Sequence, residues 1–211
     1  MKKKIIIVDY GMGNLRSVEK AFEKAGARVA VSSRPGDIRT ADKIVVPGVG
    51  AFSHAMKELR RRGLTGPILD KIKKGTPYLG LCLGLQILFP TSQEGRTKGL
   101  GLIPGRVVRF SARGGPASGG RRLKVPHMGW NTLKLSSKKC PLFKGVKKDD
   151  YFYFVHSFYA VPVHSGWKAA TTLYGGAFCS ALWKDNVYAT QFHPEKSQAA
   201  GQRIIRNFVG L

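Results

Sequence analysis

Gly80-Leu81-Cys82-Leu83-Gly84 lies at the junction between an apolar run over 76–82 and a second apolar run over 83–89. This pattern, a nucleophile between two glycines, is typical of a sharp turn from a strand into a helix. Such a turn strains the central residue, and small neighbours remove the clashes. The helix start favours the thiolate of Cys82, and the amide of Leu83 is placed to face an oxyanion. A buried structural cysteine in a glycine-rich turn is the alternative.

Strands and helices alternate through the first half of the chain. Short β-branched runs predict buried strands, and apolar residues three or four apart predict helices. Alternation of this kind is typical of a parallel sheet covered on both faces. Strands are expected at 4–8, 28–32, 43–46 and 76–82, and helices at 15–26, 51–61, 68–73 and from 83 to 89.

After about residue 100 the pattern changes to closely spaced strands separated by turns, some of which should form antiparallel hairpins. Strands are expected at 107–110, 132–135, 151–155, 168–172, 178–183 and 187–191, a surface loop at 113–122, and a closing helix at 197–209. The sequence contains no repeat and no interdomain linker. It therefore predicts one α/β domain over 1–211, with a mixed, largely parallel central sheet flanked by helices and an antiparallel portion in the C-terminal half.

A histidine and a glutamate follow the last predicted strand, in Gln191-Phe192-His193-Pro194-Glu195. A strand end is rigid and opens toward the edge of the sheet where α/β active sites lie. Glu195 is close enough to orient the imidazole of His193 and to stabilise its cation. A lone histidine is more often structural, but beside a cysteine elbow this pattern predicts a triad of Cys82, His193 and Glu195.

The remaining cysteines do not indicate a second site. Cys140 and Cys179 lack an elbow and are expected to be incidental or core thiols, and no CxxC pair indicates zinc. We expect reduced thiols and neither a metal nor a cofactor. The apolar run 5–8 is too short for a signal peptide, and no run approaches the roughly 18 apolar residues of a membrane span. These features predict a cytoplasmic protein that does not enter a membrane.

The charge is strongly positive, with 36 Lys plus Arg against 12 Asp plus Glu and a net charge of +24. Such an excess is typical of proteins that bind nucleic acid or another polyanionic partner. The basic residues are spread along the chain, however, without a basic tail or an aromatic-basic platform. We therefore favour a solvated basic surface, which would still bind nucleic acid nonspecifically in vitro.

Several segments resemble the class I (triad) glutamine amidotransferases, namely 80–86 and 192–195. Further segments resemble, more specifically, the glutaminase subunits of imidazole glycerol phosphate synthase. Together the matching segments span almost the whole chain. These are 9–15, 47–52, 124–131, 153–157 and 193–197.

The resemblance implies that Cys82 attacks the carboxamide of L-glutamine, that His193 relays protons and that Glu195 orients His193. The oxyanion would be held by the amide of Leu83 and by a backbone amide of the segment that contains Gly48 and Val49. Gly50, Gln86 and Glu94 would help to hold the glutamine, although Gln93 stands where the family often has an acidic residue. The partner-facing candidates are Asn14, His127, Met128, Trp130, Tyr153, His156 and Lys196. Trp130, Tyr153 and His156 would otherwise be core or sheet residues.

The resemblance also implies a heterodimer with a (β/α)8-barrel cyclase, which receives the ammonia. There the ammonia would join a ribulosyl-formimino-aminoimidazole carboxamide ribonucleotide, giving imidazole glycerol phosphate and the aminoimidazole carboxamide ribonucleotide used in purine synthesis. One alternative is another triad amidotransferase, such as the one serving pyridoxal phosphate synthesis, and the segment 127–131 argues against it. A second alternative is a basic nucleic-acid-binding protein on a degenerate version of the fold. That alternative predicts loss of a triad residue, and none is lost.

Overall fold

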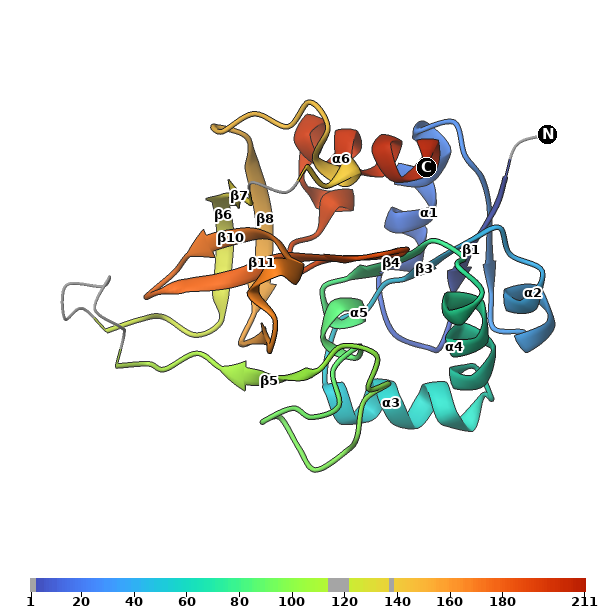
Figure 1. Cartoon of the computed structure of the whole chain (residues 1–211), viewed down its shortest axis with the longest axis horizontal. Helices are drawn as coiled ribbons and strands as arrows, with labels where there is room; N and C mark the ends of the chain where they lie inside the picture. The colour runs from blue at the N-terminus through green and yellow to red at the C-terminus, as the bar shows by residue number, and fades with distance from the viewer. Residues whose placement is uncertain (1–2, 114–121, 137–138) are drawn as a thin grey trace.

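A mixed sheet forms the centre of the computed structural model, which describes residues 3–113, 122–136 and 139–211 (Figure 1). Its first half is parallel, as the sequence predicts, because β1 pairs with β2 and β3, and β4 pairs with β3 and β12. The parallel strands in spatial order are β2 (Arg28–Ser32), β1 (Lys4–Val8), β3 (Lys43–Val46), β4 (Tyr78–Leu81) and β12 (Val187–Thr190).

The second half of the sheet is antiparallel, and a separate two-stranded ribbon stands beside it. The antiparallel strands are β11 (Ala177–Lys184), β10 (Lys168–Leu173), β7 (Lys134–Leu135), β9 (Phe158–Pro162) and β5 (Gly105–Arg109), and the ribbon is formed by β6 (His127–Thr132) and β8 (Tyr151–His156). The predicted mixed sheet is thus confirmed.

Two details of the C-terminal half differ from the sequence prediction. The strand β9 was missed, and the strand expected at 132–135 is instead the end of β6 followed by the two-residue β7. The sequence of β6 lacks the usual strand pattern, because it contains a glycine and its apolar residues do not face a core. Gly129 has a positive φ of 135°, and Met128 and Trp130 are exposed. Apart from its two ends, the loop expected at 113–122 lies outside the described residues.

Helices cover both faces of the sheet (Figure 1). Successive residues of a strand point to opposite faces, so Ile6 and Ile7 of β1 belong to two separate apolar clusters. The cluster around Ile6 includes residues of α2 (Pro35–Arg39), α3 (Phe52–Arg61) and α4 (Thr65–Lys73). The cluster around Ile7 includes residues of α1 (Leu15–Lys24) and α6 (Gln198–Gly210). Short 3-10 turns are η2 (Pro141–Phe143), η3 (Ser165–Trp167) and η4 (Pro194–Lys196).

The helix after the elbow is shorter than expected. α5 (Leu83–Gln86) is a single turn, and the prediction of a helix through residue 89 was wrong. The carbonyl oxygen of Gly84, which would bond the amide of Leu88 in a longer helix, accepts instead from the Tyr78 hydroxyl at 2.8 Å. The amides of Leu88 and Phe89 donate three residues back, to Leu85 (3.3 Å) and Gln86 (3.1 Å), as in a 3-10 turn. With one turn the helix dipole is small, so the electrostatics at Cys82 depend mainly on nearby side chains. The five-residue α2 was missed because it is too short to show a period.

A buried lysine joins the sheet to the end of the chain. The ammonium of Lys43 donates to the carbonyl oxygens of Phe208 (2.8 Å) and Val209 (2.7 Å) in the last turn of α6. Burial, reinforced by the charge of Lys3 and opposed by Asp42, lowers the pKa of Lys43 to about 8. The contact satisfies carbonyl groups that a helix end leaves without partners.

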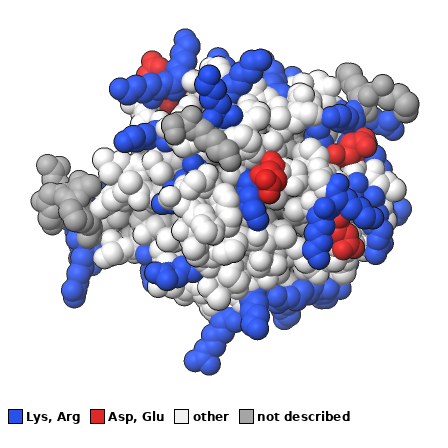
Figure 2. All heavy atoms as spheres, in the orientation of Figure 1, with Lys and Arg blue, Asp and Glu red and all other residues white. Residues whose placement is uncertain are grey.

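The other basic side chains are scattered over the face of the molecule shown in Figure 2, with wide neutral areas between them. On this face the basic side chains do not gather along a single groove. No helix in the described part of the chain is both long and apolar enough to cross a membrane.

Candidate active site

The elbow at Cys82 has the strained geometry that its flanking glycines predict. Cys82 lies between β4 and α5 with φ 52° and ψ −101°, a region that residues other than glycine rarely occupy. A Cβ on Gly80 would collide with the carbonyl oxygen of Gly84, and one on Gly84 with the carbonyl oxygen of Val46 in β3. The hydroxyl of Tyr78 donates to the same Gly84 carbonyl at 2.8 Å. The turn therefore has no room for larger residues on either side of the cysteine.

His193 and Glu195 form a buried pair directly after β12, the strand that neighbours β4. The Nδ1 of His193 lies 2.7 Å from an oxygen of Glu195, and each side chain is only 3% exposed. The main chain is also fixed, since the amide of His193 donates to the carbonyl of Tyr153 at 2.9 Å and the Ser197 hydroxyl donates to the His193 carbonyl at 2.6 Å. These contacts leave the imidazole a single orientation.

The electrostatics of His193 favour its cationic form. Burial alone would lower the pKa of His193, but the Cys82 sulfur and the Glu195 carboxylate outweigh it and raise the pKa to about 10. Nε2 makes no hydrogen bond of standard geometry with the described residues, yet the sulfur is close enough to act on the ring. The arrangement can hold a thiolate–imidazolium pair, which is the reactive state of a cysteine nucleophile.

A pocket of about 500 Å³ opens beside the sulfur at the carboxyl ends of the parallel strands. Its lining includes the predicted residues Val49, Gly50, Cys82, Leu83, Gln86, Glu94 and His156. An oxygen of Glu94 accepts from the amide of Phe52 at the start of α3 (2.7 Å), and the Gln86 amide donates to the carbonyl of Phe158 (2.9 Å). Both side chains therefore have protein partners as well as access to the pocket.

The two predicted sources of oxyanion donors contact each other. The amide of Leu83 donates to the carbonyl oxygen of Gly48 at 3.4 Å. The hydroxyl of Tyr10 holds the preceding carbonyl, that of Pro47, at 2.8 Å. A Cβ on Gly48 would collide with the Tyr10 hydroxyl and would approach the Leu83 Cβ to 2.9 Å. In this conformation a carbonyl oxygen, rather than an amide, of the Gly48 segment faces the elbow.

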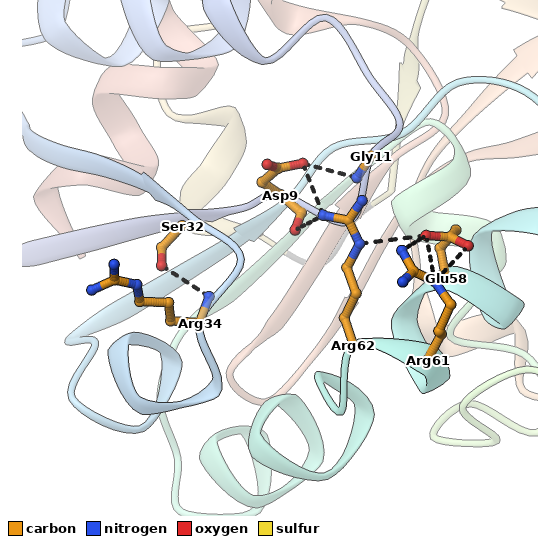
Figure 3. A network of polar contacts seen from close by, with 7 residues as sticks. All are labelled: Asp9, Gly11, Ser32, Arg34, Glu58, Arg61 and Arg62. Atoms are coloured by element: carbon orange, nitrogen blue, oxygen red, sulfur yellow. Dashed lines mark hydrogen bonds and ion pairs between the residues drawn. The ribbon is translucent and has the colours of Figure 1, made fainter.

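An arginine holds the loop that follows β1, at Asp9 and Gly11 (Figure 3). Arg62, just after α3, lies 3.4 Å from the carbonyl oxygen and 3.8 Å from a carboxylate oxygen of Asp9, and its Nε lies 3.4 Å from Glu58. Asp9 in turn accepts from the amide of Gly11 at 2.8 Å. The network closes the turn after β1, so that Tyr10 is held against Pro47.

Four of the predicted partner-facing residues lie together on the surface. Met128 and Trp130 of β6 are 63% and 46% exposed. The rings of Trp130 and Tyr153 lie 5.8 Å apart edge to face, and the ammonium of Lys196 lies 5.7 Å from the Tyr153 ring centre. The exposed Asn14 belongs to a different element, where its side chain caps α1 by accepting from the amide of Ser17 at 3.3 Å.

The other two candidates, His127 in β6 and His156 in β8, have side chains that are buried rather than exposed. Nδ1 of His127 lies 3.0 Å from Nε2 of His156, and Nδ1 of His156 donates to the carbonyl oxygen of Phe158 at 2.8 Å. Burial lowers the pKa of His127 to about 4 and that of His156 to about 3, so both rings are neutral near pH 7. His156 lines the active-site pocket.

Sequence reasoning gave no role to Gln191, which contacts the nucleophile. Its side-chain nitrogen lies 3.6 Å from the Cys82 sulfur, and its side-chain oxygen accepts from Gln86 at 3.2 Å. The available signal was its position two residues before His193, because alternate residues of an extended segment share a face.

Comparison with known proteins agrees with this geometry. The family model "Glutamine amidotransferase class-I" matches residues 6–210. The chain is 53% identical over 205 residues to the imidazole glycerol phosphate synthase subunit HisH of Syntrophotalea carbinolica, covering 97% of this chain and 98% of that one. It is 52% identical over 206 residues to the HisH subunit of Geobacter sulfurreducens, covering 97% of each. The chain belongs to the HisH subunits of the class I glutamine amidotransferases.

Solved structures place this amidotransferase within a wider fold. A putative GMP synthase subunit from Thermoplasma acidophilum superposes with a TM-score of 0.72 at 19% identity, covering 100% of this chain and 94% of that one. PurLQS from Thermotoga maritima gives 0.74 at 17% identity, covering 99% and 98%. At these identities the likeness concerns the fold alone.

Proposed function

We propose that this glutaminase hydrolyses L-glutamine to glutamate and ammonia at a triad of Cys82, His193 and Glu195. The observation that carries the proposal is the strained Cys82 elbow beside the buried His193–Glu195 pair, at one end of a pocket of about 500 Å³. Residues 1–211 would act as one domain in the cytoplasm.

The reaction follows from the arrangement of these side chains. The Cys82 thiolate attacks the carboxamide carbon, and the imidazolium of His193 gives its proton to the departing nitrogen, so ammonia leaves and a thioester remains. Water then attacks the thioester, with His193 now accepting a proton, and glutamate is released as the thiolate re-forms. Glu195 keeps Nδ1 of His193 protonated and the ring oriented. Gly50, Gln86 and Glu94, which line the pocket, would hold the glutamine.

The ammonia would pass to a (β/α)8-barrel cyclase in a heterodimer that makes imidazole glycerol phosphate for histidine biosynthesis. The HisH name of the relatives supports this acceptor over that of an amidotransferase for pyridoxal phosphate synthesis. The surface formed by Met128, Trp130, Tyr153 and Lys196 is the proposed docking face, because exposed aromatic and apolar residues are typical of interfaces. A specific nucleic-acid partner has no support beyond net charge.

The test compares two nitrogen sources in the presence of a cognate cyclase. Cys82→Ala should abolish glutamine-dependent synthesis while ammonia-dependent synthesis by the cyclase continues. A glutamine analogue with an electrophilic centre should label Cys82 alone, and Cys140→Ser, which alters a buried thiol away from the elbow, should leave both properties unchanged. Glutamine-dependent synthesis by Cys82→Ala, or inactivation through Cys140 or Cys179, would overturn the assignment.

A further inference from the structure

Gln191 is a fully buried polar side chain whose contacts converge on the nucleophile. Its main-chain amide donates to the carbonyl of Ser180 at 2.9 Å, which fixes the backbone at the end of β12. Its side chain lies between the Cys82 sulfur (3.6 Å) and the Gln86 amide (3.2 Å) and is 0% exposed. A buried amide is costly unless its groups are hydrogen-bonded, so these two contacts determine what the side chain can do.

The neighbouring groups decide which end of Gln191 faces the sulfur. The carbonyl of Phe158 can only accept, so the side chain of Gln86 must turn its NH₂ group toward it, at 2.9 Å. The same NH₂ group then donates to the side-chain oxygen of Gln191 at 3.2 Å. The NH₂ group of Gln191 is thereby directed at Cys82.

A second chain of hydrogen bonds, from the ribbon, ends on the same Phe158 carbonyl. His156 donates from Nδ1 to the same Phe158 carbonyl, and its Nε2 therefore accepts from Nδ1 of His127 at 3.0 Å. Nε2 of His127 accepts from the side-chain amide of Asn131 at 3.4 Å. Because burial keeps both rings neutral near pH 7, the directions of these bonds do not reverse at working pH.

We propose that Gln191 is a further catalytic residue, whose side-chain N–H donates a hydrogen bond to the Cys82 sulfur and stabilises the thiolate. The inference rests on the proposed function, in which this sulfur carries negative charge twice: before it attacks glutamine, and again when water breaks the carbon–sulfur bond of the thioester. Gln191 transfers no proton in either step. The thiol proton goes to His193 and then to the leaving nitrogen, and Gln191 only shares its hydrogen with the charged sulfur.

The direct test is the pH dependence of Cys82 alkylation by iodoacetamide in the assembled synthase, with the modified cysteine identified by mass spectrometry. Gln191→Met keeps the size of the side chain and removes the donor. Loss of a hydrogen bond to a charged group should move the midpoint of the alkylation curve upward by about one to two pH units. It should lower kcat by about 10- to 100-fold. KM should change less than kcat. The matched control is Gln202→Met, since the Gln202 side chain on α6 also donates a hydrogen bond, to the carbonyl of Ala21 in α1.

Other titratable groups near the sulfur must be kept constant in this comparison. They are His193 after β12, Tyr10 in the loop after β1, and His156 and Glu94 in the pocket lining. None is altered by the substitutions. A purely structural role of Gln191 would change KM and the melting temperature but would leave the alkylation midpoint where it is.

Two further measurements keep the proposal testable if Gln191→Met does not fold. Gln191→Glu retains the acceptor for Gln86 and should move the midpoint upward as well. In the unsubstituted protein, the side-chain ¹⁵N–¹H resonance of Gln191 should follow the same pH curve as alkylation and lose that dependence once Cys82 is alkylated. An unchanged midpoint in a folded variant, or a resonance insensitive to the state of Cys82, would overturn the proposal. Neither readout requires glutamine turnover, so failure of the proposed function is seen separately, in Cys82→Ala.

Discussion

The amide of Leu83 donates its hydrogen bond to the carbonyl oxygen of Gly48, 3.4 Å away, beside the sulfur of Cys82. A developing oxyanion needs that amide, and a carbonyl oxygen in its place repels negative charge. The conformation is therefore unsuited to stabilise the tetrahedral intermediate. Glycines allow the segment to change, because peptides flanked by them can turn with little steric cost.

We predict that the chain alone is a poor glutaminase and that its partner activates it. Turning the peptide that follows Gly48 would replace the carbonyl with an N–H donor, and one such donor is typically worth about 100- to 1,000-fold in rate. The measurement is steady-state glutamine hydrolysis by the chain alone, with the cyclase, and with the cyclase plus an acceptor ligand. The rate should rise in that order as the population shifts. A fully active isolated chain with no gain in the other two states would exclude the switch.

Gly48→Ala should remove most of the stimulated activity, by about 100-fold or more if the donor can no longer be presented. The added Cβ would collide with the Tyr10 hydroxyl and press on Leu83, which restricts the segment. The control is Gly66→Ala in α4, where a Cβ meets nothing within 4 Å and the helix should gain about 0.5 to 1 kcal/mol of stability. Stimulation of Gly48→Ala to the level of the unsubstituted protein would contradict the prediction.

His193→Asn should be as damaging as loss of Cys82, whereas Glu195→Gln should be about 10- to 100-fold milder, since triad members act as a unit and the orienting carboxylate is the least costly to remove. The measurement is kcat for glutamine hydrolysis in the assembled synthase, after each variant has been shown to fold. Equal rates for His193→Asn and the unsubstituted enzyme would falsify the assignment of the base.

The raised pKa of His193 predicts where activity falls with pH. The group is protonated below its pKa of about 10, so the imidazolium that donates to the leaving nitrogen persists well above neutrality and is lost only as pH rises through that value. The alkaline limb of kcat/KM should therefore lie near pH 10. Glu195→Gln removes a charge that raises the pKa, so it should move this limb to lower pH. A limb near pH 7 in the unsubstituted enzyme would show that the ion pair does not form.

Salt should weaken association with an acidic cyclase, chiefly through slower encounter, because the net charge of +24 can steer an oppositely charged partner. Association and dissociation rates are to be measured from about 0.05 to 0.5 M salt, a range over which the screening length falls several-fold. Trp130→Ala serves as a contrast, since loss of an apolar contact should act mainly on dissociation. Association rates that do not change with salt would indicate a functionally neutral charge.

Lys43 should make stability depend on pH in the alkaline range. Its pKa is lowered by folding, so between about 8 and its ordinary value of 10.5 the unfolded chain binds more protons, and stability rises with pH across that window. The free energy of unfolding should rise with pH relative to Lys43→Met, whereas the exposed Lys20→Met should parallel the unsubstituted protein. Identical pH dependences for the protein and Lys43→Met would contradict the shift.

The parallel half of the sheet, the elbow at Cys82 and the pairing of His193 with Glu195 could all be predicted from the sequence. These are local features, whose geometry follows from residue type and spacing alone. They are a β-branched run, two glycines around a cysteine, and a glutamate two residues from a histidine. The likeness of whole segments to a known family added the acceptor chemistry and the partner, which spacing does not encode.

The groups that surround the sulfur, and the directions in which they point, depend on tertiary contacts. The Gly48 carbonyl on the Leu83 amide, Gln191 beside Cys82, and the burial of His127 and His156 all depend on contacts between segments far apart in the chain. The end of α5 after one turn also depends on a side-chain contact, because the Tyr78 hydroxyl binds the Gly84 carbonyl that would extend the helix. At such points the hydrogen bonds formed on folding outweigh the local conformational preference of the chain. A glycine-rich peptide can take either orientation, and its tertiary contacts fix which one is found.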